Sequence, residues 1–352
     1  MTESKTGGHY RDAGVDIELA QTLLDRAKSK LARATRPEVL APVGGFGGLF
    51  QLDLSRYTNP VMVSSVDGVG TKLMVAALAG RHGGVGHDIV NHCIDDIAVQ
   101  GAEPVYFLDY LGIGKLRSPL YERVLEGLAE ACAAQNVALL GGETAEMPGM
   151  YGDDYDLVGC ITGIVERERM ITGESIQQGD VLIGLASNGL HTNGYSLARR
   201  VLFDVGGWTV ETSPPELGGE TIGEALLHPH TCYWPAIRRA LEDNMPIRGM
   251  AHITGGGVYD NIPRVLPDGL GAVIERDAVP VPPIFDLIAT TGDVSPREMY
   301  HVFNMGIGMV WMVPPQAVDA ALRHCSAAGL RAAPVGEIVS GRRTVTVRNV
   351  DG

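Results

Sequence analysis

The stretch Val-Met-Val-Ser-Ser-Val-Asp-Gly-Val-Gly-Thr-Lys, residues 61–72, decides how the rest of the chain is interpreted. Its valine-rich start predicts a short buried strand. This strand would deliver Asp67 to a turn that contains Gly68 and Gly70. Glycine lets the backbone turn sharply and approach a ligand closely. We therefore expect a ligand-binding turn at the end of the strand.

Thr71 and Lys72 follow the two glycines and add a hydroxyl group and an ammonium group to the same turn. Together with a carboxylate and bare N–H groups, these are the groups that hold a metal–polyphosphate. The alternative is an ordinary tight turn that carries a surface lysine, because short glycine-rich motifs often occur by chance. The Gly-x-x-x-x-Gly-Lys-Ser/Thr spacing is absent, so a phosphate site here would differ from the Walker A loop.

Composition and charge limit the class of protein. With 352 residues, of which 45% are hydrophobic, the chain can form one large or two medium soluble domains. The formal net charge of −14 argues against nucleic acid or an anionic membrane as the main partner. Five cysteines lie far apart without a Cys-x-x-Cys motif, which indicates reduced thiols in a cytoplasmic protein. The sequence has neither a signal-peptide pattern nor an apolar run of transmembrane length, so we expect no membrane partner.

Two adjacent aspartates mark the helix predicted over residues 88–101. Asp95 and Asp96 lie in mid-helix, where aspartate is a poor helix former and the two charges repel each other. His92 precedes Asp96 by four residues, so these two side chains share a face of the helix. A divalent cation held between both aspartates and Asp67 would explain the pair. The alternative is a solvated helix face, for which glutamate is the better helix former.

A second strand followed by glycines and an acid occurs further along the chain. Residues 137–140 predict a short strand, and residues 141–149 predict a loop with Glu143 and Thr144. Another glycine-rich segment precedes the central stretch and is either a wide loop or a backbone cradle for an anion. It contains Gly44, Gly45, Phe46, Gly47 and Gly48, and a strand is expected after it over residues 49–52.

A polar, charged run over residues 166–179 separates the two halves of the chain. Such a run is typical of a connection between domains. It predicts an N-terminal domain of residues 1–170 and a C-terminal domain of residues 171–352.

Two loops of the second half combine a strand end, small polar residues or glycines, and a helix start. His191 and Asn193 lie in the loop of residues 187–194, ahead of a predicted helix. His252 lies near the end of another predicted strand, and the loop after it opens a further helix. Backbone N–H groups at a helix start attract phosphate, whereas the alternative is a tight connection. The residues of this second loop are Thr254, Gly255, Gly256 and Gly257.

Eight segments, in order along nearly the whole chain, resemble the phosphoribosylformylglycinamidine cyclo-ligase family, also called aminoimidazole ribonucleotide synthetases. The segments are residues 10–16 (YRDAGVD), 44–48 (GGFGG), 65–72 (SVDGVGTK), 96–110 (DIAVQGAEPVYFLDY), 141–151 (GGETAEMPGMY), 187–197, 254–267 (TGGGVYDNIPRVLP) and 298–309 (EMYHVFNMGIGM). Together they are very specific. One departure is Asp95, where the family often has asparagine, so which aspartate of the pair binds a metal stays open.

The resemblance implies a fold and a reaction. Such proteins have an N-terminal and a C-terminal α/β domain, and their N-terminal strands pair across a homodimer to form a shared barrel. The family converts formylglycinamidine ribonucleotide (FGAM) and ATP to aminoimidazole ribonucleotide, ADP and phosphate in de novo purine biosynthesis. ATP phosphorylates the formyl oxygen, and a substrate nitrogen then closes the five-membered ring. We therefore expect an α/β (α+β) fold, a homodimer, and ATP and Mg²⁺ as cofactors.

The residues singled out above take roles by this resemblance. Asp67, Asp95, Asp96 and Glu143 would bind Mg²⁺. The ATP phosphates would lie against Gly44, Gly45, Phe46, Gly47, Gly68, Gly70, Thr71, Lys72 and Thr144. The ribonucleotide would contact Asn193, Thr254, Gly255, Gly256 and Gly257. The expected catalytic residues are His191, His252 and Lys72, the histidines because imidazole titrates in the working pH range.

Related enzymes and a non-catalytic subunit are the alternatives. Selenophosphate synthetases, hydrogenase maturation factors, thiamine-monophosphate kinases and formylglycinamidine synthetases share the glycine and acid pattern. The first need a reactive cysteine near the N-terminus, whereas the first cysteine here is Cys93. The second end in a cysteine, whereas this chain ends Asn-Val-Asp-Gly, and the last are far longer. Intact acids at positions 67, 95, 96 and 143 argue against a subunit that binds nucleotide without turnover.

Overall fold

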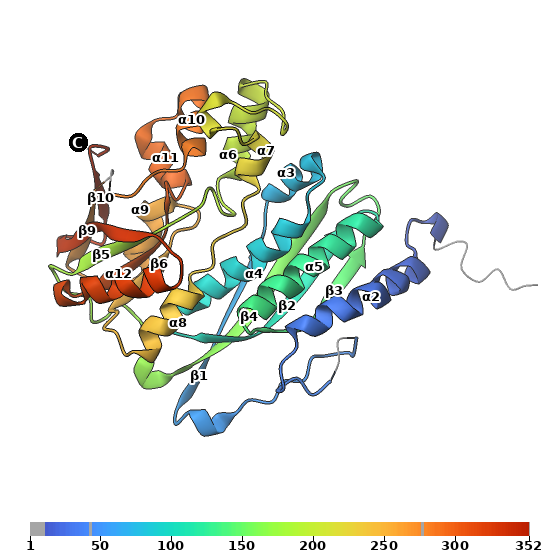
Figure 1. Cartoon of the computed structure of the whole chain (residues 1–352), viewed down its shortest axis with the longest axis horizontal. Helices are drawn as coiled ribbons and strands as arrows, with labels where there is room; N and C mark the ends of the chain where they lie inside the picture. The colour runs from blue at the N-terminus through green and yellow to red at the C-terminus, as the bar shows by residue number, and fades with distance from the viewer. Residues whose placement is uncertain (1–10, 42–43, 276–277, 352) are drawn as a thin grey trace, which may run out of the picture.

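The computed structural model describes residues 11–41, 44–275 and 278–351, which form two open β-sheets flanked by helices (Figure 1). The N-terminal part contains strands β1 (Pro60–Gly68), β2 (Glu103–Ile113), β3 (Ala138–Glu146) and β4 (Tyr155–Glu166). Its helices are α2 (Ile17–Leu31), α3 (Lys72–Ala79), α4 (Gly83–Ala98) and α5 (Ser118–Ala134). The strands follow the order β1-β4-β2-β3, so β1 and β3 are the edges of this sheet.

The C-terminal part has a larger mixed sheet. Its strands are β5 (Val181–Ala186), β6 (Gly249–His252), β7 (Leu270–Glu275), β8 (Ile307–Val313), β9 (Ala332–Ser340) and β10 (Val345–Arg348), in the order β10-β7-β9-β5-β8-β6. Its helices are α6 (Tyr195–Arg199), α7 (Ile222–Leu226), α8 (Trp234–Glu242), α9 (Gly257–Asn261), α10 (Pro283–Gly292), α11 (Pro296–Val302) and α12 (Val318–Ala327), and a π-helix over Arg200–Val205 continues α6. The expected two-part α/β architecture is thus confirmed. The boundary between domains 1–170 and 171–352 falls between β4 and β5 and stays a prediction.

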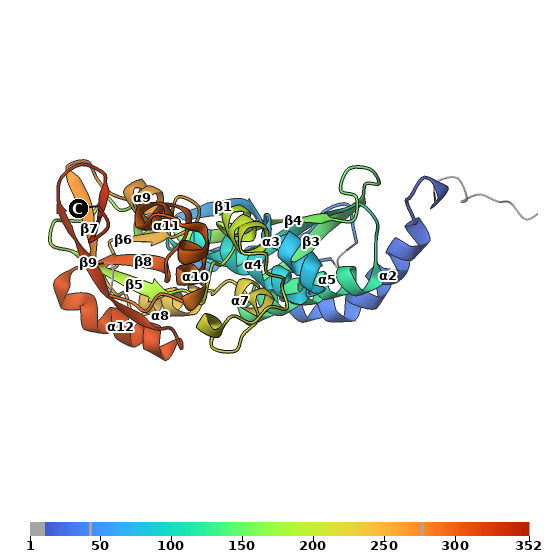
Figure 2. The same ribbon diagram turned by 90° about the horizontal axis from the view of Figure 1, so that it is seen from above.

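Helices cover one face of the N-terminal sheet. Figure 2 shows α2, α4 and α5 on the same side of its strands. The side chains of β1 alternate accordingly, and on the opposite face Met62 and Val66 are 45% and 65% exposed. Val66 lies in one register row with Cys160 of β4 and Leu108 of β2, both partly exposed. This row of the second face is therefore apolar, and no described helix covers it.

Glycines bring α4 and α5 into close contact. A Cβ atom at Gly86 would collide with the backbone nitrogen of Leu128, and one at Gly127 would collide with the carbonyl oxygen of Gly83. The crossing of the two helices therefore requires positions without a side chain. The same crossing explains why α4 begins at Gly83, whereas the sequence predicts a break there and a helix start at residue 88.

The strand predicted over residues 49–52 is not formed. This segment makes a single bridge between Val39 and Phe50. Gly48, just before it, packs so closely on Leu140 that a Cβ atom there would collide with the leucine side chain. The segment therefore lies against β3 without joining the sheet.

The loop predicted over residues 141–149 is largely strand. β3 continues through Glu146, which is in register with Ile113 of β2. Gly142 permits this pairing, because a Cβ atom there would collide with Oδ1 of Asp109. The glycines of this segment thus serve close strand packing rather than a turn.

One hydrophobic core runs through both parts of the chain. It includes Ile89 and Phe107 of the N-terminal part and Trp234 and Trp311 of the C-terminal part, none more than 4% exposed. A second core lies on the opposite face of the larger sheet, around Phe285. Within the described ranges no helix is long and apolar enough to span a membrane.

Candidate active site between the two domains

A polar row on α4 holds the segment that connects α7 to α8. Asp88 Oδ1 accepts a hydrogen bond from the backbone N–H of His230 (2.7 Å), and Asn91 donates to the carbonyl oxygen of the same residue (2.7 Å). Asp95 Oδ1 accepts from the N–H of Tyr233 (2.9 Å). All three side chains of the row are buried, so their hydrogen bonds satisfy backbone groups that water does not reach.

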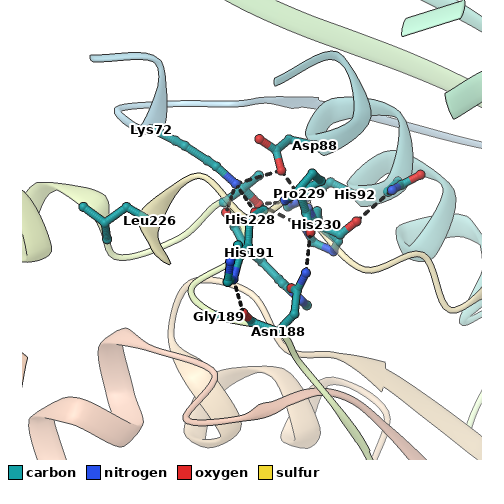
Figure 3. Close-up of polar contacts among 12 residues, drawn as sticks. Lys72, Asp88, His92, Asn188, Gly189, His191, Leu226, His228, Pro229 and His230 are labelled. Atoms are coloured by element: carbon teal, nitrogen blue, oxygen red, sulfur yellow. Dashed lines mark hydrogen bonds and ion pairs between the residues drawn. The ribbon is translucent and has the colours of Figure 1, made fainter. Parts of the chain in front are cut away.

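Lys72 extends this contact from the start of α3 (Figure 3). Its ammonium group donates to Asp88 Oδ1 (2.8 Å) and to the carbonyl oxygens of His191 (2.9 Å) and His228 (2.7 Å). The side chains of Lys72 and Asp88 are both 0% exposed. Burial lowers the pKa of Lys72, and the neighbouring carboxylate opposes this shift. All three ammonium hydrogens are used in hydrogen bonds to the protein itself. The sequence predicts instead that Lys72 contacts the phosphates of ATP.

Asp67 and Asp96 lie together beside two histidines. His92 Nε2 is 2.8 Å from Asp67 Oδ2 and 3.6 Å from Asp96 Oδ2. His252 Nδ1 is 2.8 Å from Asp96 Oδ1, and the Ser65 hydroxyl donates to Asp96 Oδ2 (3.1 Å). The structure therefore brings together three residues that the sequence predicts for the site, Asp67, Asp96 and His252, and adds His92.

Burial and charge act against each other in this group. Burial works to raise the pKa of Asp96, but the hydrogen bond and charge of His252 lower it to about 2. Partial burial works to raise the pKa of Asp67, but the neighbouring His92 lowers it, and the net shift is downward. The two carboxylates raise the pKa of His92 despite its burial, whereas burial lowers the pKa of His252 despite Asp96. Near neutral pH Asp96 is thus ionised and His252 is neutral.

Two more buried histidines lie behind this group. His230 Nε2 is 3.1 Å from His252 Nε2, and the His230 ring stacks on His191 with ring centres 4.1 Å apart. Burial lowers the pKa of His191 and His230 well below the usual range. Of the two histidines predicted to be catalytic, His252 lines the cleft between the domains, and His191 is stacked behind His230.

Two predicted metal ligands lie apart from Asp67 and Asp96. Asp95 belongs to the buried row of α4, and burial raises its pKa well above the usual range. Glu143 lies on β3, whereas Asp67 lies on β1 at the opposite edge of the sheet. Three strand spacings of about 4.8 Å separate the two strands. The structure therefore does not bring the four carboxylates into one cluster.

Asp67 and Asp96 by themselves fit a hard divalent cation. One oxygen of each and one ring nitrogen of His92 all lie within 4.8 Å of one another. Mg²⁺ is usually bound by one or two carboxylates together with water and phosphate oxygens. Two ionised aspartates at the mouth of a cleft offer this donor set.

The predicted phosphate turn lies at the junction of the domains. Gly68 ends β1, and Gly70 has φ of +70°, a left-handed conformation that favours glycine. The hydroxyl group of Thr71 is 3.2 Å from that of Ser196 in α6. The turn is therefore close to the C-terminal domain.

The remaining predicted ATP residues line a separate groove beside β3. The groove has a volume of about 600 Å³, and Gly44, Gly45, Phe46, Gly47, Glu143 and Thr144 are among its lining residues. Asp109 also lines this groove, and burial together with Glu143 raises its pKa to about 7. Asp109 has no sequence signal beyond its place near the end of β2.

An interdomain cleft of about 420 Å³ connects Asp96 to Thr254 at the start of the C-terminal glycine loop. Its lining includes Ser65, Asp96, His252, Thr254, Asn261 and Arg264. Arg264 is the cation that the loop itself lacks. No local pattern marks Arg264 for the site, because it follows Thr254 by ten residues and returns to the cleft only through the short helical turn after α9.

The glycine loop is held in a conformation that suits glycine. Gly256 and Gly257 have φ of +89° and +56°. Asn261 donates to the carbonyl oxygen of Gly257 (2.8 Å), and a Cβ atom at Gly255 would lie 3.2 Å from Asn193 Oδ1. The loop thus lies against Asn193, as expected for two parts of one substrate site.

Comparison with known proteins identifies the family of this chain. Residues 52–165 match the family model described as AIR synthase related protein, N-terminal domain, and residues 177–348 match the corresponding C-terminal domain. The fold and the site thus define a two-domain protein of the AIR synthase-related class. Phosphoribosylformylglycinamidine cyclo-ligases of Bifidobacterium animalis subsp. lactis and Geotalea daltonii are 48% and 49% identical to it over 331 and 336 residues. These alignments cover 94% and 95% of this chain and 96% of each relative, and the chain belongs to the phosphoribosylformylglycinamidine cyclo-ligase family.

Solved structures with the same fold are more distant in sequence. A thiamine-monophosphate kinase from Stenotrophomonas maltophilia has a TM-score of 0.66 at 17% identity and covers 94% of this chain and 96% of its own. The hydrogenase maturation protein HypE in complex with ATP has a TM-score of 0.66 at 16% identity, covering 96% of this chain and 93% of its own. These likenesses concern the fold alone.

Lys72→Met is expected to lower the free energy of unfolding by about 3–5 kcal/mol, because it leaves the carboxylate of Asp88 buried and unpaired. Denaturant unfolding measures this loss. Adding Asp88→Asn should recover part of it, whereas Lys115→Met at an exposed position should change stability by less than about 0.5 kcal/mol. A Lys72→Met protein as stable as the wild type but inactive would instead favour a phosphate contact.

Proposed function

We propose that this chain catalyses the ATP-dependent ring closure of FGAM to aminoimidazole ribonucleotide, with release of ADP and phosphate, in de novo purine biosynthesis. It is an ATP-dependent ligase that forms a carbon–nitrogen bond. The observation that carries the proposal is its kinship with cyclo-ligases over about 95% of the chain, together with the pair of Asp96 and His252 in the lining of one interdomain cleft. The same proposal assigns the enzyme to the cytoplasm, where its five free cysteines would stay reduced.

The reaction needs a leaving group and a proton acceptor. Transfer of the γ-phosphoryl group to the formyl oxygen turns that oxygen into phosphate, which leaves when a substrate nitrogen attacks the carbon. His252 suits the role of proton acceptor, because in the tautomer that donates from Nδ1 to ionised Asp96 its Nε2 carries a lone pair. His230 Nε2 lies 3.1 Å away and supports the imidazolium that forms.

The triphosphate requires cations and backbone donors. Asp67 and Asp96 would hold Mg²⁺, which neutralises charge on the phosphate oxygens when bound. Gly68, Gly70 and Thr71 follow Asp67 within four residues and would contact the phosphates.

The proposed reaction can be tested with purified protein, FGAM, ATP and Mg²⁺. We expect the aminoimidazole product, detected by diazo coupling. Asp67→Asn should reduce turnover at least about 100-fold, or ~2.7 kcal/mol in barrier, because it removes a hard oxygen ligand. Asp95→Asn is the matched control and should stay within about threefold of the wild type, because the side-chain oxygen of asparagine can still accept the hydrogen bond from the N–H of Tyr233. A wild-type protein that binds ATP but forms no aminoimidazole would refute the proposed reaction.

The ribonucleotide end of the substrate would lie in the cleft that contains Thr254 and Arg264. Gly255→Val is expected to raise the KM for FGAM about tenfold, ~1.4 kcal/mol, by filling space beside Asn193 without backbone strain. The KM for ATP should not change. Gly341→Val, outside the cleft, is the control. Equal increases in both KM values would argue against a ribonucleotide site here.

We also propose a homodimer that pairs the uncovered faces of two N-terminal sheets. The exposed apolar row around Val66 and the open edges β1 and β3 support it, since both are unfavourable in contact with water. The separation of Glu143 from Asp67 within one chain is also consistent with a site that draws on two copies.

Val66→Lys is expected to convert the dimer to a monomer and to lower turnover, because it places a charge in the proposed interface. Sedimentation velocity at micromolar concentration measures the first effect. Leu78→Lys, at a residue 61% exposed on α3, is the control and should leave the dimer intact. A wild-type protein that sediments as a monomer would contradict the proposed assembly.

A further inference from the structure

Three histidines from separate segments converge below the interdomain cleft. His92 belongs to α4, and His230 belongs to the segment that connects α7 to α8 and faces this helix (Figure 3). His252 lies at the end of β6. One ring nitrogen of each lies within 4.8 Å of those of the other two. The residues are 3%, 2% and 6% exposed, so the cluster is enclosed by protein.

We propose that this cluster binds a borderline-soft divalent cation such as Zn²⁺, Co²⁺ or Ni²⁺, at a site distinct from the Mg²⁺ expected on Asp67 and Asp96. Imidazole nitrogen is a preferred ligand of these ions, whereas Mg²⁺ prefers oxygen. With zinc–nitrogen bonds of about 2.05 Å, two ligands of a tetrahedral ion lie roughly 3.3 Å apart. The 3.1 Å between His230 Nε2 and His252 Nε2 is close to that separation.

Hydrogen bonds on the outer ring nitrogens orient the cluster. His252 Nδ1 donates to Asp96, and the hydroxyl oxygen of Thr192 lies 2.8 Å from His92 Nδ1 and 3.4 Å from His230 Nδ1. Histidines that bind metals usually donate their second N–H to a carboxylate or another oxygen. The tautomer that donates from Nδ1 in all three rings leaves three Nε2 lone pairs for the ion.

His92 Nε2 adds an independent observation. It is buried and has no hydrogen-bond partner among the described residues, although Asp67 Oδ2 is 2.8 Å away. The carboxylate is therefore near the ring nitrogen but outside the direction in which an N–H would donate. A buried polar nitrogen without a hydrogen bond is unfavourable, and a metal ion would use its lone pair. The carboxylate of Asp67, which stays with the Mg²⁺ site, is near enough to compensate part of the charge of this ion.

The origin of the ligands gives the ion a definite effect on the protein. His92 comes from the N-terminal domain, and His230 and His252 come from the C-terminal domain, so the ion would link the two and raise the thermal stability. It would also occupy the Nε2 lone pair of His252. An effect of the ion on catalysis through His252 rests on the proposed function, whereas binding of the ion does not.

Titration of the metal-free full-length protein with Co²⁺, in the presence of excess Mg²⁺, tests the site. We expect one Co²⁺ per chain, with the intense visible absorption of a four-coordinate ion, displaced by Zn²⁺. His92→Gln and His230→Gln should each weaken Co²⁺ binding at least about 100-fold. Loss of a residue that only hydrogen-bonds to a metal ligand weakens binding by up to about 100-fold, so a larger loss is expected for a ligand itself. His228→Gln is the matched control, because this partly exposed residue lies two positions from His230 and its ring contacts Asn188 and Glu220 instead.

X-ray absorption spectroscopy of the wild-type 1:1 zinc complex gives a test that does not depend on the folding of a variant. Three imidazole ligands are expected. Fewer than two imidazoles, or Co²⁺ affinities that are equal in the wild type and in both cluster variants, would overturn the proposal. A protein with the three-histidine spectrum that closes no ring would retain this site and lose only the proposed function.

Discussion

The hydrogen bonds between the polar row of α4 and the segment joining α7 to α8 are the contact on which the rest of the structure depends. Asp88 and Asn91 satisfy the N–H and the carbonyl group of His230, and Asp95 satisfies the N–H of Tyr233. Removing a partner from a buried polar group costs about 1–3 kcal/mol, so these backbone positions are strongly held. Because the His230 backbone is held in this way, its ring is directed toward His252, and the bottom of the cleft takes its shape from a helix of the other domain.

Neighbouring residues on α4 illustrate how one helix builds two environments. Successive residues of an α-helix point about 100° apart. Asp95 consequently faces the buried junction, where its pKa is raised, while Asp96 faces the cleft, where its pKa falls to about 2. One carboxyl group accepts a hydrogen bond at the buried junction, and the next is an ionised carboxylate beside His252. Because burial disfavours a charge on Asp95, the repulsion expected between two adjacent charges is reduced.

The sequence predicts the fold class, most elements, and the meeting of Asp67, Asp96 and His252, because strand ends, helical spacing and glycine loops are local signals. It does not predict that α4 is also buried on its polar side, so it places Asp95 in the cation site although this residue points to the junction. Lys72 follows a glycine turn and suggests a phosphate contact, yet only the tertiary structure shows that its three acceptors come from three distant segments. His230 and Arg264 have no local signal either, because their places depend on how the two domains meet.

The contact between the N-terminal and C-terminal parts limits whether either part can fold alone and how far the two can separate. The sheets are separate, but the core around Ile89 and Trp311 is continuous, and Lys72 is enclosed by carbonyl groups of the other half. An isolated N-terminal half would expose this core and leave buried charges without partners, so the halves form one cooperative folding unit rather than interchangeable modules. A wide hinge opening would break the same contacts. Ligand exchange that preserves these contacts would have to occur at the rim of the cleft, without a wide separation of the two parts.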